Sequence, residues 1–230
     1  MTGIAIAFDR VTAGYAHQPV LQDFSAAFAA GSLTAIAGPN GAGKSTLMKL
    51  AAGMLRPRAG TVTAPRTLSY LPQLATIQRD FPLTALDAVC TGFYRSRGLS
   101  HPLTDADRAR ARMAMHEVGL HRCENRLLDE LSGGQFQRLL FARVLIEDAP
   151  TILLDEPFAA VDAATTRTLL QLIAGWHREG RTVLCVLHDL ALVRRHFPDT
   201  LLLTDTRGVS HHGPTAALAT RGLLSSDEAA

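Results

Sequence analysis

The sequence predicts an α/β fold built around parallel strands, and two observations support this prediction. Short apolar segments with the length of buried strands alternate with longer amphipathic segments, most clearly between residues 151 and 187. A glycine-rich loop, Gly38–Ser45, stands between an apolar segment and a helical one, as in strand–loop–helix units of parallel sheets.

The elements follow from the apolar pattern along the chain. The predicted strands of the N-terminal third are Ile4–Phe8, Val20–Phe28, Leu33–Ala37, Gly60–Thr63 and Leu68–Leu71. A helix is predicted over Ser45–Ala52, and residues 84–129 have a helical pattern throughout. The later predicted elements are a helix at Phe136–Asp148, a strand at Thr151–Asp155, a helix from about Asp162 to Arg178 and a strand at Thr182–Leu187.

Composition narrows the class of protein. The chain has 230 residues and a formal net charge of +2, and no basic cluster indicates nucleic-acid binding. Its three cysteines are far apart in the sequence, which predicts reduced thiols rather than disulfides or a metal site. Neither a signal peptide nor an apolar run of membrane-spanning length is present. We therefore expect a chain that does not cross a membrane, although it can dock on one that does.

The loop Gly38–Ser45 matches the phosphate-binding pattern G-x-x-x-x-G-K-S at every position. Its glycines let backbone amides wrap the β- and γ-phosphates, Lys44 supplies a positive charge, and Ser45 supplies a hydroxyl to Mg²⁺. Only Lys44 and Lys49 are lysines among the 23 basic residues. The chain uses arginine at the other 21 basic positions. A lysine kept in the loop despite this bias favours a functional loop over a chance match.

The segment Leu131-Ser-Gly-Gly-Gln135 predicts a second anion-binding helix start. Ser132 and Gln135 have the spacing of a capping box, in which each side chain accepts a bond from the other residue's backbone amide. Gly133 and Gly134 leave the helix N-terminus bare, so its amides and the positive end of the helix dipole can face a phosphate. Taken alone, the segment would be interpreted as an ordinary glycine-containing cap, and the functional interpretation depends on the other motifs.

Two predicted strands end in polar residues suited to hydrolysis. Asp155 is expected to hold Mg²⁺, and Glu156 is expected to act as the general base that polarises the attacking water. Pro157 ends this strand, and the apolar run before it argues against two ordinary surface acids. His188 ends the neighbouring strand and can donate a hydrogen bond to a γ-phosphate oxygen. Ligands of parallel sheets bind at this carboxyl edge.

Two further residues give weaker signals. Gln73 follows the strand that ends at Leu71, where it can orient water or touch Mg²⁺ and where the backbone can hinge. Tyr15 can stack on an adenine ring, or it can be an aromatic at a strand end that packs on the core.

With these motifs in this order, the chain resembles an ATP-binding cassette (ABC) ATPase over nearly its whole length. The resemblance implies a single P-loop NTPase domain with a RecA-like α/β core at about 1–81 and 147–220. It also implies a small antiparallel β-subdomain, an inserted α-helical subdomain at about 82–146, and a tail at 221–230. ATP and Mg²⁺ are the implied cofactors.

The resemblance also implies residue roles. The implied nucleotide-binding residues are Tyr15, Gly38, Pro39, Asn40, Gly41, Ala42, Gly43, Lys44, Ser45 and Thr46, with Ser132, Gly133, Gly134, Gln135 and Asp162 acting on the ATP of a partner chain. The implied catalytic residues are Glu156, His188, Lys44 and Gln73, and the implied Mg²⁺ ligands are Ser45, Gln73 and Asp155. One departure lies before Asp162: Ala159 stands where this loop often begins with serine.

A finer resemblance concerns the cargo. The segment Asp80-Phe81-Pro82 and the residues after it are similar to ATPases of zinc and manganese uptake systems. We expect an importer ATPase for a divalent metal, zinc before manganese, with an iron-chelate importer as the nearest alternative. His211 and His212 are interpreted as a solvated surface pair and not as evidence for a metal.

Other classes that share the signature fit less well. DNA-repair ATPases interrupt the core with long coiled coils, translation factors usually carry two cassettes, and an inactive cassette would lack the intact catalytic residues. The resemblance further implies a head-to-tail homodimer, integral membrane permease subunits and, indirectly, an extracytoplasmic metal-binding protein. The expected location is peripheral, on the cytoplasmic face of the inner membrane.

Overall fold

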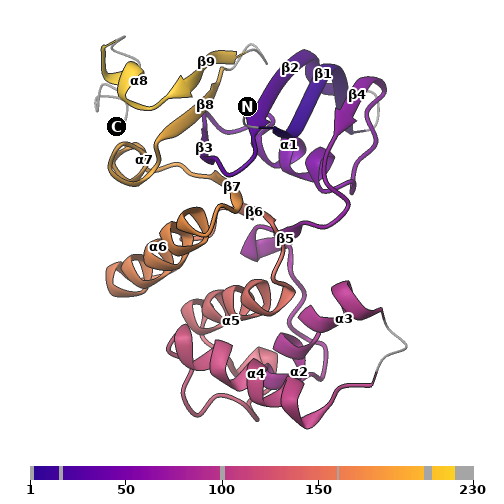
Figure 1. Ribbon diagram of the computed structural model, residues 1–230, viewed down its shortest axis with the longest axis vertical. Helices are drawn as coiled ribbons and strands as arrows, with labels where there is room; N and C mark the ends of the chain where they lie inside the picture. Colours follow the sequence, from indigo (N-terminus) through magenta and orange to yellow (C-terminus); the bar gives the residue numbers. More distant parts are fainter. Residues whose placement is uncertain (1–2, 16–17, 99–101, 160, 205–208, 221–230) are drawn as a thin grey trace. The chain divides into compact units, whose positions relative to one another are not determined.

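The computed structural model describes residues 3–15, 18–98, 102–159, 161–204 and 209–220 (Figure 1). The chain forms two compact units. The first unit contains residues 1–68, 150–156 and 176–230, and the second contains residues 69–149 and 157–175. The predicted helical subdomain, 82–146, therefore lies inside the second unit.

An antiparallel sheet forms one part of the first unit. Its strands β1 (Ile4–Tyr15), β2 (Gln18–Ala29) and β4 (Ala59–Thr63) lie in the order β2-β1-β4. The ring of Phe8 packs edge-on against Phe24 and Phe28, with ring centroids 5.7 and 6.3 Å apart. This sheet confirms the small antiparallel β-subdomain.

A mainly parallel sheet forms the other part of the first unit. Strands β6 (Thr151–Asp155), β7 (Thr182–Val186), β3 (Leu33–Ala37), β8 (Asp199–Leu203) and β9 (Val209–Pro214) follow one another in that order. Every residue of β3, β6 and β7 is buried, which explains their apolar sequences. Helix α1 (Lys44–Ala51) follows β3 through the glycine-rich loop. The parallel pairs β3–β7, β3–β8 and β6–β7 confirm the predicted α/β core.

The C-terminal part of the first unit contains elements that the sequence pattern did not predict. They are α7 (Leu190–His196), the antiparallel pair β8–β9 and the short helix α8 (Ala216–Thr220). The interpretation of His211 and His212 as a solvated pair is wrong for His211. Its side chain is buried at the β9 edge, with Nε2 3.2 Å from the Pro214 carbonyl oxygen. The His212 ring lies against Phe28, and burial lowers its pKa.

The second unit contains the predicted helical region. Its elements are β5 (Ser69–Leu71), η1 (Leu74–Thr76), α2 (Ala85–Cys90), α3 (Gly92–Arg97), α4 (Asp105–Glu117), η2 (Leu128–Glu130), α5 (Gly133–Glu147) and most of α6 (Ala163–Arg178). Helices α2, α3 and α4 all contact α5 (Figure 1). Thr104 begins α4 with a capping box, and Ser132 begins α5 in the same way.

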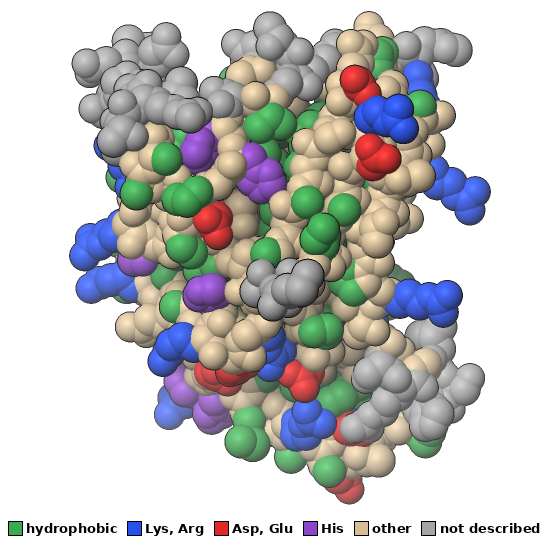
Figure 2. Space-filling model, turned by 45° about the horizontal axis from the view of Figure 1, so that its top comes forward, with side chains coloured by type: hydrophobic (Ala, Val, Ile, Leu, Met, Phe, Trp, Pro, Cys, Tyr) green, Lys and Arg blue, Asp and Glu red, His purple; other side chains and the backbone are tan. Residues whose placement is uncertain are grey.

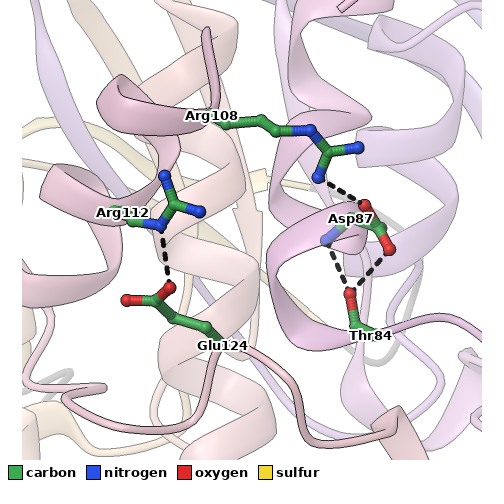
Figure 3. Close-up of polar contacts among 5 residues, drawn as sticks. All are labelled: Thr84, Asp87, Arg108, Arg112 and Glu124. Atoms are coloured by element: carbon green, nitrogen blue, oxygen red, sulfur yellow. Dashed lines mark hydrogen bonds and ion pairs between the residues drawn. The ribbon is translucent and has the colours of Figure 1, made fainter. Parts of the chain in front are cut away.

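A polar cluster joins α2 to α4 (Figure 3). Asp87 accepts hydrogen bonds from the Thr84 hydroxyl at 2.7 Å and from the Arg108 guanidinium at 3.0 Å. The Thr84 hydrogen bond is the main cause of a lowered Asp87 pKa, and Arg108 adds to it. Arg112 pairs with Glu124 at 2.8 Å beside this cluster.

Within the described ranges, no helix is both long and apolar enough to cross a membrane. On the face drawn in Figure 2, acidic and basic side chains are interspersed among hydrophobic and polar ones.

Candidate functional site

The loop between β3 and α1 requires glycine where other chain segments come close. Gly38 has φ 143°, and a Cβ there would lie 2.6 Å from the Leu203 carbonyl oxygen. Gly43 has φ 97°, and a Cβ there would lie 2.8 Å from Cδ2 of Leu21. Both positions combine a positive φ with close packing, so the loop keeps its curved backbone only with glycine.

Lys44 is held inside its own loop. Its side chain is buried, and Nζ donates hydrogen bonds to the carbonyl oxygens of Gly38 and Pro39, both at 2.7 Å. Burial lowers the Lys44 pKa, while the nearby charges of Glu156 and Asp155 act in the opposite direction. The ammonium group therefore lies within the loop, where phosphate oxygens can replace the carbonyl partners.

Asp155 and Ser45 form an oxygen-rich pair beside the loop. Asp155 ends β6 and is 1% exposed, and the Ser45 hydroxyl donates to its Oδ1 at 3.2 Å. A carboxylate and a hydroxyl are ligands that suit Mg²⁺, so this donor set fits the ion. Ser45 and Asp155 would hold Mg²⁺ here, and the ion would supply positive charge that offsets the negative charge developing on the phosphate.

Glu156 and His188 are brought together at the ends of β6 and β7. His188 Nε2 lies 2.6 Å from Glu156 Oε1. The Glu156 amide donates to the Val186 carbonyl at 3.3 Å, and its φ of 53° is in the left-handed region. Both side chains are less buried than Asp155. A carboxylate in this position can accept a proton from water. The imidazole can keep that carboxylate in a fixed orientation.

Tyr15 lies at the end of β1 and is 48% exposed, so it does not pack in the core. Its hydroxyl accepts a hydrogen bond from Lys49 Nζ at 3.2 Å, and the same ammonium group lies 5.4 Å from the ring centroid. The sequence does not predict the contact between Lys49 and Tyr15. The scarcity of lysine is the one sequence feature that sets Lys49 apart. The exposed ring face remains available for stacking on a planar ligand.

The other predicted site residues belong to the second unit. Gln73 precedes η1 and lines a surface cavity of about 410 Å³ together with Arg79 and Ala159. The Ser132 hydroxyl accepts from the Gln135 amide at 3.2 Å, and Gln135 Oε1 accepts from the Ser132 amide at 3.0 Å. This reciprocal pair is the predicted capping box.

Asp162 has a local role at the start of α6. Its carboxylate accepts a hydrogen bond from the Thr165 amide at 2.7 Å, and this contact is the main cause of its lowered pKa. The first unit thus brings together Lys44, Ser45, Asp155, Glu156 and His188, while Gln73, Ser132–Gln135 and Asp162 lie in the second unit.

Comparison with known proteins identifies the family of the chain. A family model described as ABC transporter matches residues 21–159. The chain belongs to the ABC transporter family. This ABC cassette is 41% identical over 218 residues to the manganese transport system ATP-binding protein MntB of Bacillus subtilis (strain 168). The alignment covers 91% of this chain and 86% of the relative. The cassette is 40% identical over 210 residues to the zinc transport system ATP-binding protein TroB of Treponema pallidum (strain Nichols), with coverage of 88% and 79%.

A solved structure extends the comparison. A dimeric ATP-binding cassette in a post-hydrolysis state, bound to ADP and Pi, superposes with a TM-score of 0.82 at 25% identity, covering 91% of this chain and 98% of the other. The predictions of a P-loop NTPase fold, of ATP with Mg²⁺ as cofactors, and of ATPase activity are thereby confirmed.

Proposed function

We propose that this ABC cassette is the ATP-hydrolysing subunit of an importer for a divalent metal, with zinc as the cargo. The observation that carries the hydrolytic part is the assembly of Lys44, Asp155, Glu156 and His188 at one edge of a parallel sheet. The metal cargo is supported by the names of the two relatives and by the Asp80-Phe81-Pro82 segment.

The residues divide the work of hydrolysis. Backbone amides of Gly38–Thr46 and the Lys44 ammonium bind the β- and γ-phosphates, and Tyr15 stacks on the adenine. Glu156 accepts the proton of the attacking water as general base. His188 holds the Glu156 carboxylate before ATP arrives and donates to a γ-phosphate oxygen afterwards. Ser45, Asp155 and Gln73 are the proposed Mg²⁺ ligands.

The nucleotide site is completed by a second copy of the chain. One phosphate site does not need two glycine-rich helix starts from the same chain, yet this chain carries one at Lys44 and one at Ser132. In the proposed head-to-tail dimer, Ser132–Gln135 and Asp162 of one copy face the ATP held by the loop of the other. The dimeric state of the solved cassette supports this arrangement.

We propose that the permease contact lies near Gln73. The cavity beside it is lined by Leu74, Ile77 and Arg79, which offer an apolar surface with one charge, and Phe81 nearby in sequence is 63% exposed. Such a surface suits a short helix of a membrane subunit. We place the cassette on the cytoplasmic face of the membrane, with a metal-binding protein delivering the cargo from outside.

Metal uptake by cells tests this proposal. Cells lacking the chain should fail to accumulate zinc under zinc limitation, and wild-type chain should restore uptake while the Glu156→Gln variant should not. Normal zinc uptake with lost manganese uptake would replace zinc by manganese as the cargo. Normal uptake of both metals would overturn metal import altogether.

A further inference from the structure

Gln137 is buried in the second turn of α5 and is 0% exposed. Its Nε2 donates a hydrogen bond to the Pro157 carbonyl oxygen at 2.8 Å. Its Oε1 is also buried and has no hydrogen-bond partner among the described residues. The amide therefore makes one strong contact and leaves its acceptor unsatisfied.

Stability alone does not explain this amide. A buried acceptor without a partner destabilises the folded state, and an apolar side chain of the same shape would avoid that penalty. Residues that break such a rule are typically found where function requires them. The contact that Gln137 does make identifies the place where its function lies.

That place is the peptide next to the proposed general base. Pro157 follows Glu156 directly, and the chain passes from the first unit to the second between these two residues. Glu156 has φ 53°, a conformation that a non-glycine residue keeps only when its surroundings hold it there. Two hydrogen bonds fix the segment: the Glu156 amide donates to the Val186 carbonyl oxygen, and Gln137 Nε2 donates to the Pro157 carbonyl oxygen.

We infer that Gln137 is a positioning residue for hydrolysis, which anchors the Glu156–Pro157 segment so that the Glu156 carboxylate faces the attacking water. The inference rests on the proposed role of Glu156 as general base. Gln137 lies in α5, the helix that Ser132 caps, and it is less than two helical turns from Ser132. A contact made at Ser132 by a partner's nucleotide is thereby connected, through α5, to the residue beside the base.

The test is Gln137→Met, which removes the amide and keeps the length of the side chain. We expect kcat for ATP hydrolysis to fall at least about tenfold, because small displacements of a catalytic group are costly. KM for ATP and the melting temperature should stay close to those of wild type. The matched control is Ser69→Ala, which removes another buried hydrogen bond of α5, the one from Ser69 to Glu147. It should lower the melting temperature and leave kcat unchanged.

A double variant separates positioning from a general structural effect. If Gln137 acts through Glu156, adding Gln137→Met to Glu156→Gln should slow single-turnover hydrolysis no further. A kcat of Gln137→Met within about twofold of wild type, or full additivity of the two changes, would overturn the inference. A different result, hydrolysis at the normal rate by the single variant Glu156→Gln, would contradict the proposed function itself.

Discussion

His188 and Glu156 are separated by 32 positions in the sequence, yet His188 Nε2 lies 2.6 Å from Glu156 Oε1. The pairing of β6 with β7, in which Asp155 lies opposite Val186, brings both side chains to the same edge of the sheet. The imidazole therefore lies where it can orient the carboxylate. Hydrolysis is expected to depend on both residues together.

Glu156→Gln should lower ATP turnover by about 10²–10⁴-fold, since an amide does not accept the proton of the attacking water. ATP binding should be retained, because the phosphate contacts come from the loop. Steady-state ATPase rates and the affinity for a fluorescent ATP analogue measure the two effects. Glu117→Gln, a change at an exposed position of α4, is the control and should behave as wild type. Near-normal hydrolysis by Glu156→Gln would remove Glu156 from this role.

Lys44→Ala should weaken ATP binding or phosphate positioning, because it removes the ammonium group that lies within the loop. Arg56→Ala removes an exposed positive charge a few residues beyond α1 and serves as the control for net charge. Calorimetric titration with ATP gives the affinities, and ATPase assays give the turnover. Unchanged affinity and turnover in Lys44→Ala would contradict the assignment of the loop.

Mixing two inactive variants tests the composite site. Ser132→Arg blocks the start of α5, and Lys44→Ala disables the loop, so each homodimer should be inactive. A mixed head-to-tail dimer would contain one site built from an intact loop and an intact Ser132 segment. The mixture should therefore hydrolyse ATP faster than either variant alone. Absence of any recovery, with mixed dimers detected by crosslinking, would argue against a site shared between chains.

The Asp87 cluster predicts a pH dependence of stability. The Thr84 hydrogen bond and Arg108 lower the folded-state pKa of Asp87, so the fold favours its charged form. This stabilisation is present above the ordinary carboxyl pKa and is lost as the pH falls through the lowered folded-state value. Asp87 is partly exposed, so the loss should be below about 1 kcal/mol. Urea unfolding should show a weaker loss of stability on acidification in Asp87→Asn than in wild type. Asp129→Asn, at an exposed position, should follow wild type.

The sequence predicted most elements that carry a strong local pattern. The loop Gly38–Ser45, the Ser132 cap and the apolar strands before Asp155 and His188 are each determined by a few adjacent residues, and the structure contains them as predicted. Sequence order alone also predicted that polar strand ends meet at one edge, because parallel strands share that edge.

The remaining features depend on contacts between distant segments. His211 is buried because of its position in β9, which pairs with β8, and two adjacent histidines in the sequence do not predict this burial. Gln137 falls within an apolar helical pattern, and its contact with Pro157 is 20 positions away in sequence. Strand β9 runs antiparallel to β8, an arrangement that the pattern of alternating strands and helices does not predict.

The two lysines of the chain are both in α1, the helix that begins at the phosphate loop, and they differ in exposure: Lys44 is buried while Lys49 is partly open and touches Tyr15. Apart from the terminal amine, an amine-directed reagent therefore has targets only around this one helix. Its rate of reaction at Lys44 and Lys49 becomes a chemical reporter of loop occupancy that needs no engineered label. Protection of both lysines by ATP would be readable by mass spectrometry on the unmodified protein.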